Sequence, residues 1–205
     1  MRIVLTVASR GRFHMASQML KRSTSGKSFL FVAAVLAGTA RAGTLPSEVS
    51  GMSVLNGKIE SYKFAGEKTT VVAFLSARCP CSSSHEPLLQ QISDEFPDVA
   101  FVGIHSNSNE SSEETAKHFA NSALKIPVIQ DSGAALATAF GALKTPHVFV
   151  VNKLGEVIFS GGITDAHDIK RATKQYLRLA LQTIKDGRNP DPAQVRSLGC
   201  MIQRN

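Results

Sequence analysis

Short apolar runs that alternate with amphipathic segments limit this chain to folds in which helices cover a sheet. The run TTVVAFLS at 69–76 is apolar and rich in β-branched residues, as expected of a strand buried on both faces. Further strands are predicted at 99–105, 127–130, 147–152 and 157–160, with an edge strand at 58–62. The strands at 147–152 and 157–160 are close enough to form a hairpin.

Helices are predicted between and after these strands, at 82–96, 111–121, from 133 onward and at 165–185. Serines provide N-caps for the first, and the second opens with the capping box Ser111 to Glu114. The element order mixes parallel crossovers with a terminal antiparallel hairpin. It therefore predicts one α/β sandwich with a mixed central sheet.

The first 42 residues have the layout of a secretory signal. They contain no acidic residue, and a basic segment ending at Lys27 precedes an apolar core and an Ala-Arg-Ala step that ends at Ala42. We predict a secreted or periplasmic protein cleaved after Ala42, with a mitochondrial presequence as the alternative. The apolar core is too short to span a bilayer, so no stable membrane anchor is expected after cleavage. The domain is then 43–188, followed by a tail, 189–205.

The charge of the chain without its leader gives no reason to expect a nucleic-acid partner. The whole chain has 23 basic and 16 acidic residues, but seven of the basic residues lie in the leader. The remaining chain therefore carries 16 of each sign, and the net positive charge belongs to the leader alone.

Three cysteines, Cys79, Cys81 and Cys200, are too few for a disulfide-stapled scaffold and point instead to reactive thiols. Cys79 follows a strand and precedes a helix. Its sulfur is therefore expected near the unpaired N–H groups of a helix N-terminus, which stabilise a thiolate. Arg78 adds positive charge if its side chain turns inward.

The stretch FLSARCPCSSSHEPLL, with Pro87 inside the helix, resembles the strand, cysteine and helix unit of the thioredoxin superfamily, and especially the redoxins that include peroxiredoxins. The Thr145-Pro146 step before HVFVVN extends the resemblance over roughly 51–185. It implies a thioredoxin-like α/β/α sandwich. It also implies a cis Thr145–Pro146 bond opposite Cys79, where the backbone of a substrate strand is received.

The cysteine spacing departs from both reactive subgroups. Laid on a thioredoxin Cys-x-x-Cys, Cys79 takes the nucleophile position, but Ser82 stands at the resolving position and Cys81 falls one residue early. Laid on a peroxiredoxin, Ser76 matches the Thr or Ser three residues before the peroxidatic cysteine, while Val72 replaces a proline. Residues i and i+2 of a helix point apart, so we expect Cys79 to face solvent and Cys81 to pack inward.

Cys200 lies beyond the last predicted helix, in the segment LGCMI. Some redoxin-like proteins carry a similar Gly-Cys-x-Ile near their end, so this resemblance makes Cys200 the candidate resolving thiol. The alternative is a free or packed tail cysteine.

The histidines raise a second possibility. His147 follows the proline step and can approach Cys79, so that Cys79, Cys81 and His147 form an alternative soft-metal site, which His85 could join. Copper-delivery proteins of cytochrome oxidase assembly use two cysteines and a histidine on this fold. The other histidines of the domain are expected at ordinary solvated positions: His105, His118 and His167.

Three functions follow. In the first, the Cys79 thiolate attacks a peroxide or the disulfide of a protein partner, Ser76 hydrogen-bonds the oxidant, Thr145-Pro146 positions the partner, and Cys200 or an external thiol resolves the product. This chemistry needs no diffusible cofactor. The second is a copper(I) metallochaperone using Cys79, Cys81 and His147. The third is a redoxin fold kept for protein binding, without turnover.

Overall fold

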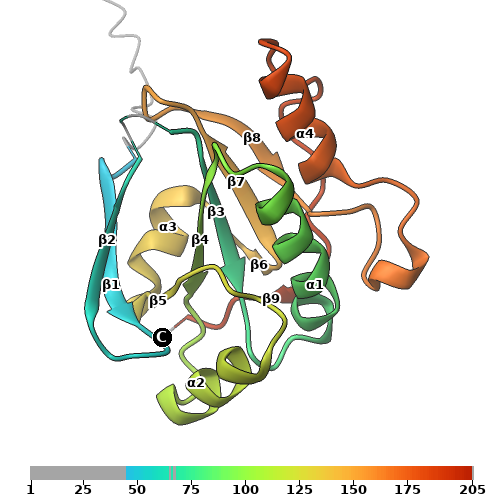
Figure 1. Cartoon of the computed structure of the whole chain (residues 1–205). Helices are drawn as coiled ribbons and strands as arrows, with labels where there is room; N and C mark the ends of the chain where they lie inside the picture. The colour runs from blue at the N-terminus through green and yellow to red at the C-terminus, as the bar shows by residue number, and fades with distance from the viewer. Residues whose placement is uncertain (1–44, 65, 67, 205) are drawn as a thin grey trace, which may run out of the picture. The chain divides into compact units, whose positions relative to one another are not determined.

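A computed structural model describes residues 45–64, 66 and 68–204, so the predicted leader lies outside the described residues. Seven strands form one mixed sheet in the order β2-β1-β5-β4-β3-β7-β8, and β6 and β9 form a second, two-stranded sheet (Figure 1). The strands are β1 (Glu48–Ser53), β2 (Ile59–Lys63), β3 (Thr70–Leu75), β4 (Ala100–His105), β5 (Val128–Gln130), β6 (Lys144–Thr145), β7 (His147–Val151), β8 (Val157–Gly161) and β9 (Cys200–Met201).

The centre of the large sheet matches the predicted architecture. Strand β3, every residue of which is buried, pairs parallel with β4 and antiparallel with β7, and β4 pairs parallel with β5. The antiparallel hairpin of β7 and β8 closes the sheet on one side. The predicted α/β sandwich with a mixed central sheet is therefore confirmed.

Helices cover both faces of this sheet. They are α1 (Pro80–Glu95), α2 (Ser112–Asn121), α3 (Ala135–Phe140) and α4 (Tyr176–Lys185), with 3-10 turns at Ser132–Ala134 and Ile169–Arg171. Successive side chains of β3 alternate between the faces: Val71 and Leu75 join the cluster with α1 and α4, whereas Val72 and Phe74 join the cluster with α3. Figure 1 shows α1 and α4 on one side of the sheet and α3 on the other.

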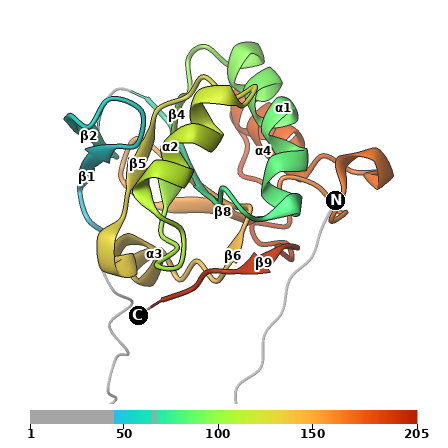
Figure 2. The same cartoon turned by 90° about the horizontal axis from the view of Figure 1, so that it is seen from below.

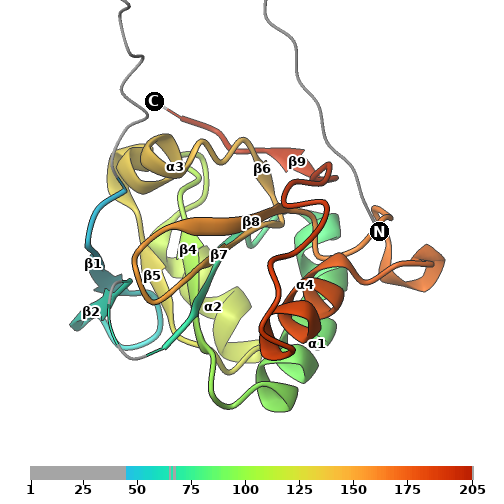
Figure 3. The same cartoon turned by 90° about the horizontal axis from the view of Figure 1, so that it is seen from above.

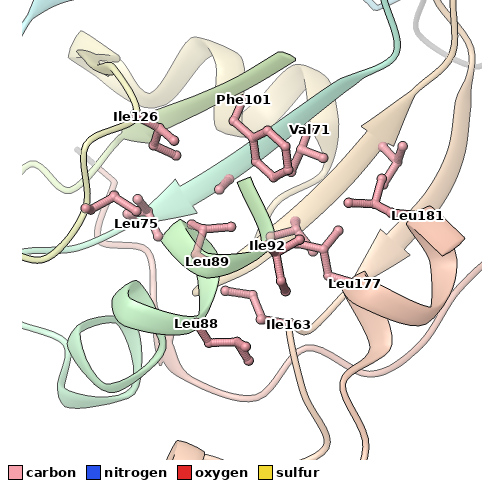
Figure 4. Close-up of a cluster of buried hydrophobic side chains, with 14 of the residues drawn as sticks. Val71, Leu75, Leu88, Leu89, Ile92, Phe101, Ile126, Ile163, Leu177 and Leu181 are labelled. Atoms are coloured by element: carbon pink, nitrogen blue, oxygen red, sulfur yellow. The ribbon is translucent and has the colours of Figure 1, made fainter. Parts of the chain in front are cut away.

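The cluster between the sheet and α1 and α4 is the larger part of the core. Leu89 and Ile92 of α1 and Leu177 and Leu181 of α4 are at most 1% exposed. Figure 4 shows these side chains converging with those of β3. This packing holds α1 against the sheet, so the first turn of α1 has a defined position relative to the end of β3.

Two predicted boundaries differ from the structure. The helix predicted over 165–185 begins only at Tyr176, because the Asp165 carboxylate accepts hydrogen bonds from the backbone N–H groups of Thr173 and Lys174 and closes a loop. The first helix begins at Pro80, ahead of the predicted serine caps. Strand β1 was not predicted, since only two of its six residues are buried and no apolar pattern marks it.

The C-terminal residues return across the domain. Ser160 and Val195 pair through their backbones, Cys200 lies opposite Thr145 in the β6–β9 pair, and the carbonyl of Gln203 accepts from the N–H of Ser108. Figures 2 and 3 show β9 lying beside β6 from opposite sides of the molecule. The predicted cis bond between Thr145 and Pro146, directly after β6, is confirmed.

In the described part of the chain, no helix combines the length and the apolar character needed to cross a membrane.

Candidate functional site: a three-cysteine cluster

Cys79 is the N-cap of α1, just after the end of β3. Its backbone is extended, with φ −78° and ψ 112°. Its N–H donates to Ser76 Oγ at 3.0 Å, and its carbonyl accepts from the N–H of Ser83 at 3.0 Å. The side chain therefore lies at the helix end where free backbone N–H groups gather, as the sequence predicted.

The sulfur of Cys79 does not face solvent, and that prediction was wrong. The residue is 2% exposed, and its Sγ–H donates to the carbonyl oxygen of Thr145 at 3.0 Å. The step before Pro146 therefore lies against Cys79, as expected. Exposure was overestimated because β9, which brings Cys200 beside Thr145, was not predicted.

The sulfurs of all three cysteines meet at this point. The Sγ atoms of Cys79, Cys81 and Cys200 lie within 4.8 Å of one another, and all three are free thiols. Cys81 is half-buried and Cys200 is exposed, so the predicted order of exposure for Cys79 and Cys81 is reversed. The rule that i and i+2 point apart holds within a helix, but the extended backbone of Cys79 places its side chain outside that rule.

The thiols differ in acidity. Burial raises the pKa of Cys79, but hydrogen bonds to its thiolate from Cys200, from the Thr145 side chain and from the Ser82 backbone outweigh it, so the pKa is lowered. The Thr145 hydroxyl is buried and makes no hydrogen bond to any other described residue, so it is free to donate to this thiolate when Cys79 ionises. Burial and the negative charge of Cys79 raise the pKa of Cys81. Burial and the hydrogen bond to Cys79 raise that of Cys200 to about 12. Cys79 is therefore the first thiol to ionise.

A buried carboxylate, that of Glu110, holds the residues just before Cys79 in place. Glu110 accepts hydrogen bonds from the Ser76 hydroxyl at 2.5 Å and from the Ala77 N–H at 2.7 Å, and lies 3.0 Å from His105 Nε2. Ser76 in turn accepts from the Cys79 N–H. The Ser76 hydroxyl, which we predicted to hydrogen-bond an oxidant, therefore donates its proton to Glu110. Ser76 positions Cys79 instead.

Sequence reasoning missed Glu110. It lies in the polar loop NSNESS, where a buried acid has no periodicity to distinguish it from a solvated one. Its burial raises its pKa, but hydrogen bonds from His105, Ser76 and Ala77 outweigh this, so the pKa is lowered. The prediction of a solvated His105 was wrong, because this side chain is fully buried and bonded to Glu110.

Arg78 turns away from the cysteines. Its guanidinium makes two hydrogen bonds to Glu114, at 2.6 and 2.7 Å, on the exposed surface. The helix end and the neighbouring hydroxyl and thiol, rather than this arginine, supply the stabilisation of the Cys79 thiolate.

His147 does not join the cluster. Among the described residues, only the three cysteines bring ligand atoms together as a group of three or more, and His147 is not a member. Burial and the charge of Lys144 lower its pKa to about 4. The predicted pairing of Cys79 and Cys81 is therefore completed by Cys200 and not by this histidine.

The remaining histidines have separate roles. His85 is buried and bonds to the Cys81 carbonyl and to Thr164, each at 2.7 Å, so it does not join the cluster. His118 is partly exposed and pairs with Glu86 at 2.8 Å. His167, predicted as an ordinary solvated residue, has its Nδ1 atom 3.5 Å from the sulfur of Cys81.

The sequence model of the Redoxin family matches residues 42–175. Comparison with curated proteins gave no match. An uncharacterized conserved protein from Geobacillus kaustophilus is 21% identical, with a TM-score of 0.71, over 80% of this chain and 92% of that one. A hypothetical protein from Sinorhizobium meliloti 1021 is 24% identical, with a TM-score of 0.70, over 80% and 94%. StoA from Bacillus subtilis is 21% identical, with a TM-score of 0.50, over 57% of this chain and 88% of that one. These structural likenesses establish the shared fold.

Proposed function

Because the chain belongs to the Redoxin family, we propose that it is a thiol-based oxidoreductase in which Cys79 is the nucleophile and Cys200 the resolving thiol. One observation carries the proposal: three sulfurs lie within 4.8 Å of one another, and the one at the helix end has the lowered pKa. Reactive cysteines are found where a thiolate is stabilised in this way.

The first step is attack by the Cys79 thiolate on an oxidant. With a peroxide, the sulfur forms an S–O bond and the O–O bond breaks, which gives a sulfenic acid and, after protonation, an alcohol or water. With a disulfide, a mixed disulfide forms and one thiolate leaves. The N–H of Ser82 and the hydroxyl of Thr145 stabilise the sulfur charge before attack.

The second step uses the C-terminal strand. Cys200 attacks the oxidised sulfur of Cys79, and a Cys79–Cys200 disulfide forms as water or the substrate thiol leaves. Cys81 lies within reach of both sulfurs and can exchange with this disulfide. Two thiols of a protein partner then restore the reduced chain through the exposed Cys200 and become a disulfide themselves.

Strand β9 also limits the oxidant. The edge expected to receive a substrate strand at Thr145 is paired with Cys200 of the chain itself. A protein strand can pair there only after β9 leaves, whereas a peroxide or a small disulfide needs only to reach the sulfur. We therefore favour a small oxidant for the first step and a protein partner for the return of electrons.

The predicted leader supports export. Residues 1–42 carry the basic segment, apolar core and small-residue step of a secretory signal. A secreted or periplasmic location is part of the proposal, because disulfides that form during turnover persist in such compartments.

Stoichiometric oxidation of the full chain tests this function. The reduced protein is treated with one equivalent of hydrogen peroxide or of a small disulfide and mapped by non-reducing peptide mass spectrometry. We expect a disulfide that links Cys79 to Cys200. In a Cys81→Ser/Cys200→Ser double variant, which keeps no second thiol beside Cys79, a dimedone adduct or a mixed disulfide should accumulate on Cys79.

The Cys81→Ser variant is the matched control and should still form the Cys79–Cys200 disulfide. Consumption of oxidant by Cys79→Ser at the wild-type rate would refute the proposal.

A further inference from the structure

The three cysteines also have the arrangement of a metal site. Their sulfurs come from three places in the chain, namely the N-cap of α1, its first turn and β9, and lie within 4.8 Å of one another. Three thiolates around one ion, at the usual metal–sulfur length of about 2.3 Å, are about 4 Å apart in a plane. The cluster reaches that geometry with a contraction of less than about 1 Å.

The donor set selects a soft ion. Thiolate sulfur favours copper(I) and zinc over hard cations, which prefer oxygen. Protein zinc sites with structural roles are almost always four-coordinate. In the described chain the group contains three ligand atoms and no fourth, because none of His147, His85 and His167 belongs to it. A d10 copper(I) ion is satisfied by three ligands.

The surroundings suit the charge of such a complex. Copper(I) with three thiolates carries two net negative charges, which are costly to bury without hydrogen-bond donors. Groups that can donate lie beside two of the sulfurs. The N–H of Ser82 and the buried Thr145 hydroxyl, which has no partner of its own among the described residues, favour the charged form of Cys79. The Nδ1 atom of His167 lies 3.5 Å from the sulfur of Cys81 and donates to it in the Nδ1–H tautomer. Outer groups of this kind orient ligands and tune a metal site.

The third ligand is held in place before any ion binds. Ile202 donates its N–H to the Leu143 carbonyl at 2.9 Å, and Ser197 Oγ donates to the Pro146 carbonyl at 2.8 Å, one on each side of Cys200. A Cβ on Gly199 would lie 2.0 Å from the Thr145 carbonyl oxygen, so only glycine permits this approach. The tail is thus fixed where Cys200 completes the cluster.

We propose that the reduced protein binds one copper(I) ion through the sulfurs of Cys79, Cys81 and Cys200, with β9 supplying the third ligand. The ion and the disulfide need the same sulfurs, so copper binding and oxidation exclude each other. The proposal goes beyond the thiol chemistry above. It can be tested on fully reduced protein without any oxidant, so the two proposals succeed or fail separately.

The test is an anaerobic titration of the reduced full chain with copper(I) in competition with bathocuproine disulfonate. We expect one ion per chain. Replacing the third ligand, as in Cys200→Ser, should weaken binding at least about 100-fold, beyond the 10- to 100-fold usual for the loss of an outer group. X-ray absorption of the loaded wild type should show three sulfur neighbours and no nitrogen.

His147→Gln is the matched control and should bind as the wild type does. Thermal unfolding monitored by circular dichroism would confirm that both variants are folded. Unchanged affinity in Cys200→Ser, equal loss in His147→Gln, or zinc binding as tight as copper(I) binding would each overturn the proposal.

Discussion

The body of α1 and the region around its first residue are buried in different ways. Along the helix, Leu89 and Ile92 are fully buried among other apolar side chains. At its start, Ser76, Cys79 and Glu110 are nearly as buried, but they are polar or reactive and held by hydrogen bonds. Apolar burial stabilises a fold directly, whereas polar burial is tolerated only when partnered. In the proposed function, the start of α1 is the end at which the reaction takes place.

The largest expected effect separates chemistry from stability. Cys79→Ser should lower consumption of peroxide or a small disulfide at least about 100-fold, because the thiolate is the nucleophile in the proposed reaction. Its melting temperature should change little, since the two side chains are nearly isosteric. Steady-state assays with dithiothreitol as reductant, together with calorimetry, check both.

The converse substitution lies in the apolar region. Leu89→Ala should reduce the free energy of unfolding by about 2–5 kcal/mol, since the side chain is fully buried in the cluster under α1. Urea titration measures this. The variant should still form the Cys79–Cys200 disulfide when it is oxidised at low temperature. A folded variant that failed to form it would contradict the division between residues that stabilise the fold and residues that carry the thiol chemistry.

A buried histidine should make the fold sensitive to acid. Burial and Lys144 hold the pKa of His147 at about 4, below its unfolded value of about 6.5. The unfolded chain therefore binds the proton first, and stability falls as pH drops from 6.5 toward 4, by roughly 2 kcal/mol after allowance for partial exposure. In His147→Gln the free energy of unfolding should depend less on pH between 6.5 and 4, and at pH 8 it should equal that of the wild type. Denaturant titrations at several pH values measure both.

An effect of similar size is expected at the buried carboxylate. Glu110→Gln should destabilise the protein by about 1–3 kcal/mol at pH 7, because an amide cannot accept all the hydrogen bonds that Glu110 accepts. Its lowered folded pKa means that the carboxylate stabilises the fold above the unfolded pKa of about 4.3, and that this stabilisation is lost as pH falls through the folded value. The difference between variant and wild type should therefore shrink in acid. A constant difference would contradict this account.

The smallest effect is expected at Arg78. Its ion pair with Glu114 is on the surface, and exposed ion pairs contribute little to the stability of a protein. Arg78→Ala should leave the pH titration of the Cys79 Cβ signal, followed by NMR, unchanged within error. A clear rise in the pKa of Cys79 in this variant would show that the arginine acts on the thiolate after all.

Much of the apolar region could be predicted from the sequence. The run at 69–76 became β3 because a largely apolar segment rich in β-branched residues is stable only when both of its faces are covered. The Thr145-Pro146 step was found from the family resemblance. These are local patterns, and the structure preserves them.

The polar region depended on contacts between distant segments. The position of Cys200 beside Cys79 rests on a two-residue strand, too short for any period. Burial of Glu110 depends on Ser76 and Ala77, more than thirty residues earlier. The start of α4 was misplaced because Asp165 bonds to Thr173 and Lys174 in a loop that no helical pattern encodes. Each of these errors came from hydrogen bonds that follow no helical or strand period.

The most direct test is a pH titration of the chain labelled with 13C at the cysteine Cβ atoms, followed by NMR. The sequence has three cysteines, so three signals report the three thiols without requiring a reagent to reach a buried sulfur. Cys79 should ionise first, with Cys81 later and Cys200 last, near pH 12. Ionisation of Cys81 or Cys200 ahead of Cys79 would contradict the account.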